Sequence, residues 1–192
     1  MKFGLIVSKQ HPPGVSMVER FHEHIDQVRA ARDAGFDLIV MGQHYLSTPF
    51  QEMQTLPSLA RLAAEAGSMR VGATVLLLPL HNPVDVAEQV ATLDVICEGR
   101  FIFGVGLGYR NEEYEAFGIR PRERVARFVE ALQVIKLLWS EEEVTHHGRF
   151  FHLTKARMVL NPVQTPHPPI WFAANNDGAV ERSARMADAW VI

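Results

Sequence analysis

The chain contains a single cysteine among its 192 residues, and this scarcity excludes two kinds of structure. An internal disulfide and a thiolate metal cluster both require more than one cysteine, so neither can form within the chain. Cys97 ends an apolar run that begins at Leu93, which predicts a buried thiol without a chemical role.

Long runs of one charge and long apolar runs are also missing. The chain has 19 basic and 22 acidic residues, a net charge of -3, and no Lys or Arg cluster long enough to follow a nucleic acid or an anionic membrane. Its apolar start, Met1 to Val7, is too short for the apolar region of a secretion signal. We therefore expect a cytoplasmic protein that binds neither nucleic acid nor membrane.

Histidines are present, but their spacing does not favour a metal site. His22 and His24 lie two positions apart in a predicted helix and so face different directions, unlike a ligand pair four residues apart. His146, His147 and His152 lie near one another without acidic or thiol partners in a ligand pattern. We expect both groups on the solvated surface and predict no metal site.

Short apolar segments rich in Val, Ile and Phe alternate with segments of helical periodicity. The predicted strands cover residues 3–7, 36–41, 71–78, 101–105, 170–174 and 189–192. Helix boundaries have typical signals, with a capping box at Ser16 and Glu19 and an N-cap with proline at Asn82 and Pro83. Because buried strands alternate with helices, we expect an α/β fold with a parallel sheet.

After the fourth helix, which is predicted to end near Trp139, the chain leaves this pattern. Residues 145–150 predict a small β-hairpin, and a proline-rich stretch then leads to the fifth strand. Six strands suit either an open doubly wound sheet or part of a TIM barrel. The glycine-rich segment from Gly104 to Tyr109 has tyrosine where a dinucleotide fingerprint needs its third glycine, so a nicotinamide site is weakly supported.

Four segments, residues 36–45, 71–83, 93–108 and 171–176, together resemble the luciferase-like monooxygenase family. Their order and spacing extend the resemblance over nearly the whole chain. It implies a (β/α)₈ TIM barrel that is incomplete, with about six strands present, in a single domain over residues 1–192 that stops before the last strands. If the chain ends there, its edge strands stay open, so we expect either a fragment of a longer flavoprotein or a homo-oligomer such as a dimer.

The resemblance also implies roles for residues at the C-terminal ends of the strands, where barrels place their active sites. His44 is expected to be catalytic, acting as a base or hydrogen-bond donor beside a flavin, although a histidine here could simply cap a strand end. Thr74 and Val75 match the position of a non-proline cis peptide under the flavin ring. Gly106 and Gly108 are expected to let the fourth strand approach the flavin, and so is Gly104.

The same resemblance implies a phosphate site where the fifth strand meets a helix. Ala174, Asn175 and Asn176 are expected to hold the flavin phosphate, with the N-cap of the helix as a compatible simpler role. Leu107 stands where the family often has a phosphate-binding arginine, and Arg110 could replace that cation or face solvent. Gly106 stands where some luciferases have a reactive cysteine, so cysteine chemistry is excluded there.

Other features near the site carry simpler expectations. Asp177 should point away from the phosphate, because like charges repel. Glu113 and Tyr114 match an acidic and aromatic pair of the family, which we expect to be structural.

The function implied by the resemblance is oxidation of a small organic substrate by reduced FMN and O₂, with FMNH₂ supplied by a separate flavin reductase. An alternative is hydride transfer with the deazaflavin F420, which needs no O₂. A third possibility is a flavin-binding or partner subunit without catalytic activity.

Overall fold

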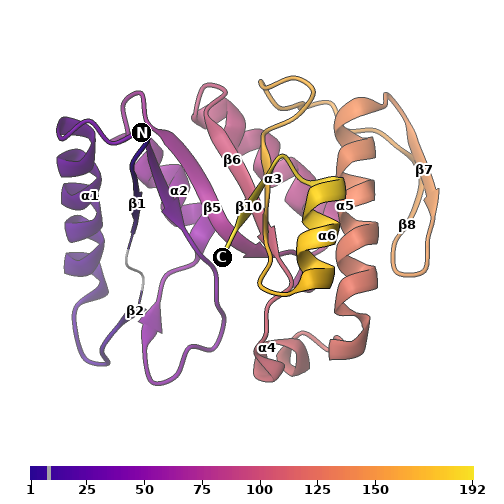
Figure 1. Cartoon of the computed structure of the whole chain (residues 1–192), viewed down its shortest axis with the longest axis horizontal. Coiled ribbons are helices and arrows are strands. Elements are labelled where there is room, and N and C mark those ends of the chain that lie inside the picture. The colour runs from indigo at the N-terminus through magenta and orange to yellow at the C-terminus, as the bar shows by residue number, and fades with distance from the viewer. Residues whose placement is uncertain (8–9) are drawn as a thin grey trace.

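The computed structural model describes residues 1–7 and 10–192 as one curled sheet with helices packed around it (Figure 1). The six strands of this sheet are all parallel and run in the order β1-β3-β5-β6-β9-β10. Their bounds are Gly4–Ile6 for β1, Leu38–Met41 for β3, Arg70–Leu77 for β5, Phe101–Gly106 for β6, Ile170–Ala173 for β9 and Ala189–Val191 for β10. The arrangement is an incomplete barrel, as predicted.

Helices connect consecutive strands of the sheet. They are α1 (Met17–Asp33), α2 (Thr55–Ala63), α3 (Pro83–Ile96), α4 (Asn111–Ala116), α5 (Arg124–Ser140) and α6 (Asp177–Met186), with short 3₁₀ turns at Leu78–Leu80 and Pro121–Glu123. The predicted caps are confirmed, because the Ser16 hydroxyl accepts from the Glu19 amide and the Asn82 side chain accepts from the Val84 amide. The strand and helix alternation seen in the sequence is therefore encoded locally, at the helix ends.

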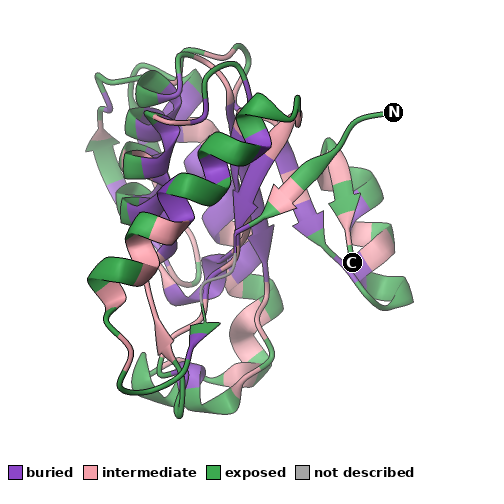
Figure 2. Cartoon of the chain, turned by 90° about the vertical axis from the view of Figure 1, so that its left-hand side faces the viewer, coloured by how far each residue is buried: buried purple, intermediate pink, exposed green. Residues whose placement is uncertain are grey.

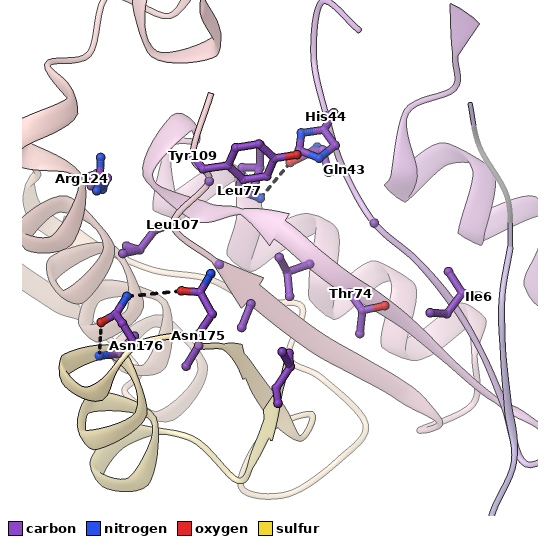
Figure 3. A pocket seen from close by; sticks show the side chains of 18 of the residues that line it. Ile6, Gln43, His44, Thr74, Leu77, Leu107, Tyr109, Arg124, Asn175 and Asn176 are labelled. Carbon is purple, nitrogen blue, oxygen red and sulfur yellow. Dashed lines mark hydrogen bonds between the residues drawn. The ribbon is translucent and has the colours of Figure 1, made fainter. Parts of the chain in front are cut away.

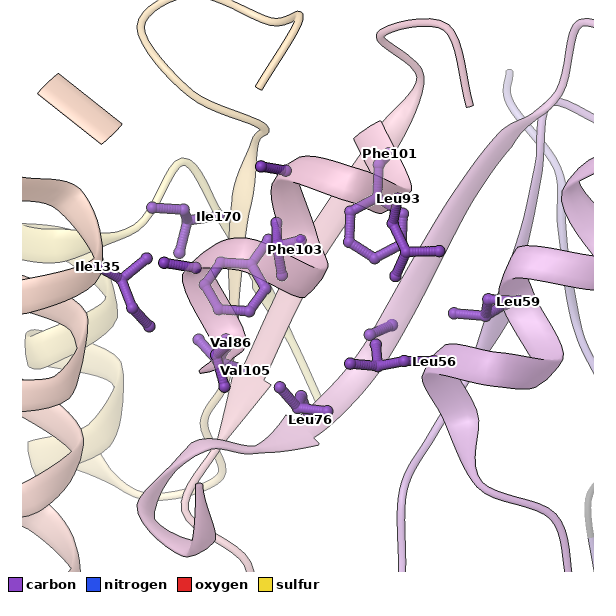
Figure 4. Close-up of a cluster of buried hydrophobic side chains, with 14 of the residues drawn as sticks. Leu56, Leu59, Leu76, Val86, Leu93, Phe101, Phe103, Val105, Ile135 and Ile170 are labelled. Carbon is purple, nitrogen blue, oxygen red and sulfur yellow. The ribbon is translucent and has the colours of Figure 1, made fainter. Parts of the chain in front are cut away.

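The hydrophobic core lies between the sheet and the helices α2, α3 and α5 (Figure 4). Phe101 and Phe103 of β6 are fully buried against side chains from these helices, among them Leu59 and Ile135. Cys97 is buried in the same core, as expected. Figure 2 shows that burial is concentrated along the strands and on the inward faces of the helices. This core holds the strand ends that form the pocket described below.

Two small antiparallel pairs lie outside the main sheet. The first pairs β2 (Gln10–His11) with β4 (Gln51–Glu52), and the sequence did not predict it. The second is the predicted hairpin, formed by β7 (Val144–His147) and β8 (His152–Ala156). Its second strand lies later than residues 145–150 suggested, because the turn occupies 148–151.

Two of the histidines expected on the surface are not there. His24 is buried, and its Nε2 lies 3.2 Å from Nε2 of His11. His146 is half-buried, with Nε2 3.4 Å from the Glu130 carboxylate. The prediction was wrong for these two because β2 covers α1 and the hairpin folds back onto α5, contacts that the local spacing does not reveal. Among the described helices, none is long and apolar enough to cross a membrane.

Candidate active site

An open pocket of about 680 Å³ lies at the C-terminal ends of the parallel strands (Figure 3). Loops after β3, β5, β6 and β9 all contribute to its wall, as a barrel fold predicts. All the predicted site residues except Arg110 line it, namely His44, Thr74, Val75, Gly106, Gly108, Ala174, Asn175 and Asn176. The structure therefore brings together side chains that lie up to about 130 positions apart in the sequence.

His44 is held by a buried carboxylate that the sequence analysis took to be structural. Its Nδ1 lies 2.9 Å from Oε1 of Glu113, whose side chain is 0% exposed. The Tyr45 amide donates to the same oxygen over 2.8 Å. Since a carboxylate only accepts, Nδ1 carries the proton of this bond, and Nε2 is left as the ring atom that serves the pocket.

The second carboxylate oxygen of Glu113, Oε2, is buried and has no hydrogen-bond partner in the described part of the chain. The expectation that Glu113 is only structural is thus at odds with its contact to His44. The sequence signal for this pair was weak, because Glu113 lies on α4 and 69 residues separate it from His44.

A hydrogen-bonded layer that is uncharged at neutral pH lies behind His44. Gln43 is buried, and its Oε1 accepts from the Leu77 amide over 3.0 Å and lies 2.9 Å from Nε2 of His81. Gln43 Nε2 donates to the Tyr45 hydroxyl over 3.1 Å. Removal from water lowers the pKa of His81 to about 4 and raises the pKa of Tyr45 to about 12, so both groups are neutral at pH 7.

The middle of the pocket wall is formed by the end of β5. The peptide bond between Thr74 and Val75 is cis, as the resemblance implied, and the register between β5 and β6 shifts at this point. The Thr74 hydroxyl is buried and has no hydrogen-bond partner among the described residues. Thr74 lines the pocket, so this hydroxyl is available to a bound molecule.

The glycines of β6 are also needed by contacts within the protein, and their expected approach to a flavin stays a prediction. A Cβ added at Gly104 would overlap the carbonyl oxygen of Ala73, and Gly104 does not line the pocket. A Cβ at Gly106 would lie 2.6 Å from Cγ2 of Val75. Both glycines thus make room for the irregular end of β5, and of the two only Gly106 also lines the pocket.

The side of the pocket away from His44 has the donors of an anion site (Figure 3). Asn176 caps α6, with its Oδ1 accepting from the Ala179 amide over 3.1 Å, and its Nδ2 donates to Asn175 over 3.3 Å. The amides of Asp177 and Gly178 precede the first hydrogen bonds of α6, in which the amides of Ala179 and Val180 donate to Asn176. The helix dipole favours a negative charge at this end. Asp177 is exposed and does not line the pocket, as expected.

Arg124 is a cation of this region that the sequence analysis missed. Arg124 begins α5 and lines the pocket. Its side chain makes no hydrogen bond or ion pair with any other residue that the structure describes. Figure 3 places it with Leu107, Asn175 and Asn176, on the opposite side of the pocket from His44.

Arg110, which was expected to be the replacement cation, is directed elsewhere. Its Nη1 donates to the Tyr45 carbonyl over 3.1 Å and its Nη2 donates to the Leu46 carbonyl over 2.9 Å. Loop carbonyls bind the guanidinium and Arg110 does not line the pocket, so the structure does not favour the contact with a cofactor that was expected of it.

Comparison with known proteins shows the family and agrees with this fold. The model of the luciferase-like monooxygenase family matches residues 1–192, and the chain belongs to this family. It is 33% identical over 170 residues to a protein of Kineococcus radiotolerans named F420-dependent glucose-6-phosphate dehydrogenase, covering 84% of the chain and 49% of that relative.

Two solved structures have the same fold. Monooxygenase RslO1 from Streptomyces bottropensis is 30% identical with a TM-score of 0.87, covering 96% of the chain and 57% of that structure. The oxygenating constituent of 3,6-diketocamphane monooxygenase of Pseudomonas putida, solved in complex with FMN, is 20% identical with a TM-score of 0.88, covering 100% of the chain and 58% of that structure. The chain thus spans about half the length of these relatives.

Proposed function

We propose that the chain forms the cofactor-binding part of an oxidoreductase in which reduced FMN and O₂ oxidise a small organic substrate. The observation that carries this proposal is that the two sides of the pocket differ in their chemistry. One side has a histidine backed by a buried carboxylate, and the other has an unpaired cation beside a helix N-terminus. A flavin nucleotide needs both, because its ring must lie at the acid–base group and its phosphate at the positive end.

The residues of the pocket fit such a cofactor. Asn175, Asn176 and the first amides of α6 would hold the phosphate, and Arg124 would supply the cation that is absent at position 107. The ring would lie along Thr74 and Val75, where the buried hydroxyl of Thr74 still lacks a partner.

When bound, reduced FMN would supply two electrons that, with two from the substrate, reduce O₂, so that one oxygen atom enters the substrate and the other leaves as water. The chain's own contribution at the reacting end is proton transfer by His44. Glu113 holds the Nδ1 proton, so Nε2 is the atom that accepts a proton from the substrate. The Glu113 carboxylate then stabilises the positive charge that the imidazole gains, and the same Nε2 returns the proton later.

A second candidate is hydride transfer with F420, favoured by the relative that is 33% identical and is named for F420. The same phosphate donors and the same His44 would serve it. The two proposals differ in their partners, because only the FMN reaction needs O₂ and a separate flavin reductase. Assembly into a homo-oligomer stays a prediction that sedimentation velocity would test.

Equilibrium titration of the chain with FMN, riboflavin and F420 tests the cofactor. We expect the double variant N175A/N176A, and separately R124A, to weaken FMN by roughly tenfold or more while changing riboflavin little, because riboflavin has no phosphate. Arg122 is a matched control, since it is an exposed arginine two positions before Arg124 and lies outside the pocket.

Each outcome of this titration bears on the proposal. Equal weakening of FMN and riboflavin would show that the Asn175 turn does not contact phosphate. Tighter binding of F420 than of FMN would support the second candidate. Failure to bind either cofactor would reject the cofactor proposal altogether.

A further inference from the structure

We propose that Arg110 is a positioning residue for His44, which holds the segment after His44 in place and so keeps His44 against Glu113. The inference rests on the proposed function only in taking His44 as the proton-transferring group. The structural part of the proposal concerns contacts within the chain, and its test needs no cofactor.

This role follows from the hydrogen bonds of the guanidinium. Arg110 donates to the carbonyls of Tyr45 and Leu46 over 3.1 and 2.9 Å, and its Nη1 lies 3.4 Å from the Ser47 hydroxyl. Leu46 has a φ of 50°, in the left-handed region, so the chain turns sharply there. The two carbonyls and the Ser47 hydroxyl therefore all face the guanidinium of Arg110. A planar guanidinium reaches two such carbonyls at once, whereas the single nitrogen of lysine does so poorly.

This segment is continuous with the residues that bind Glu113. The Tyr45 amide donates to Oε1 of Glu113, the oxygen that also holds Nδ1 of His44. Holding the Tyr45 carbonyl therefore orients the peptide that precedes it, and with it the backbone of His44. Loss of Arg110 should loosen the amide of Tyr45 first.

Arg110 also lies close to the carboxylate that binds His44. Its Nη1 lies 3.9 Å from Oε1 of Glu113, and the side chains of Arg110, His44 and Glu113 are only 22%, 19% and 0% exposed. At such exposure opposite charges attract one another more strongly than in water. The guanidinium therefore supports the carboxylate that accepts the Nδ1 proton of His44.

The test is NMR of the His44 ring in the chain without cofactor, with its signals assigned by their loss in H44N. The Nδ1 proton that is hydrogen-bonded to Glu113 is the signal to follow. We expect both R110Q and R110K to shift or broaden it, because neither side chain spans the two carbonyls. R120Q is the matched control and should leave the signal unchanged, because Arg120 forms an ion pair of the same spacing and length, 3.9 Å, with Glu123 at an exposed place away from His44.

Hydrogen exchange of the Tyr45 amide also tests the proposal. We expect exchange to be roughly tenfold faster in both R110Q and R110K, because neither side chain spans the two carbonyls, and unchanged in R120Q. An unchanged Nδ1 proton signal of His44, or unchanged exchange of the Tyr45 amide, in R110K would overturn the proposal. R110K decides it even if R110Q does not fold.

These results are independent of the proposed function. If the chain binds neither FMN nor F420 but the His44 signal and the Tyr45 exchange change as expected, the proposed function fails and the role of Arg110 stands. If a cofactor binds but neither readout changes, only the inference about Arg110 fails.

Discussion

Replacing Gly104 by alanine is expected to destabilise the fold without acting on the pocket directly. Gly104 is buried in β6, and an added Cβ would overlap the carbonyl oxygen of Ala73 and lie 3.1 Å from its carbonyl carbon. These are backbone atoms of the neighbouring strand, so they cannot turn aside as a side chain would. Relief requires β5 and β6 to separate next to the residues that line the pocket.

The size of the effect follows from two opposing contributions. Forcing an extra methyl group into a packed core costs about 1 to 3 kcal/mol, and a clash with backbone belongs at the upper end. Alanine restricts the unfolded chain more than glycine does, which returns about 0.5 to 1 kcal/mol. The free energy of unfolding should therefore fall by about 2 kcal/mol. With a urea dependence of about 2 kcal/mol per molar, the midpoint should fall by roughly 1 M.

Urea unfolding followed by circular dichroism measures this shift, with G178A as the control. A Cβ at Gly178 would meet only Oδ1 of Asn176, at 3.9 Å, and the residue lies in the first turn of α6. Alanine there should leave the midpoint unchanged or raise it slightly. If G104A unfolds at the same urea concentration as the natural chain, the close approach of β5 to β6 does not constrain this position and the reasoning is wrong.

Two further predictions concern His44 and the hairpin. H44N should lower turnover by roughly 10²-fold, measured as initial rate with whichever cofactor binds, and an unchanged rate would remove His44 from the chemistry. Burial acts to raise the pKa of Glu130, but hydrogen bonds from the amides of Phe150 and Phe151 and from His146 outweigh it, so the pKa is lowered. This contribution to stability is present above the pKa of the unfolded chain and is lost as the pH falls through the folded pKa. E130Q should therefore flatten the loss of stability in acid, and urea midpoints at pH 7 and pH 4 would detect it.

The fold could be predicted because its signals are local. The alternation of apolar strands with amphipathic helices, and the caps at Ser16 and Asn82, each depend on residues a few positions apart. The short pair of β2 with β4 escaped prediction because two-residue strands leave no periodicity. The end of the hairpin was misplaced for a related reason, since the amides of its turn are held by Glu130, which lies on another element.

The edge of the sheet that carries the pocket could be predicted as well, but the partners of the side chains there could not. Parallel strands bring their C-terminal ends together, so His44 and Asn176 had to lie on the same edge. Nothing in the spacing says that Glu113 reaches back to His44, because that contact depends on how α4 lies after the loop that follows β6. The family resemblance supplied the positions of the residues and left their contacts open.

The two arginines that follow β6 show where this limit lies. Arg110 and Arg124 have the same chemistry, and the glycine strand ends shortly before the first of them, which made Arg110 the nearer candidate for a phosphate. The two side chains lie in different places in the structure. Arg110 immediately precedes α4 and turns toward the carbonyls of Tyr45 and Leu46, while Arg124 begins α5 and lines the pocket. The direction of each side chain is set by the helix that follows it and not by its distance from β6 along the chain. The cation of the proposed phosphate site is therefore expected at the first residue of α5 and not directly after the glycine strand.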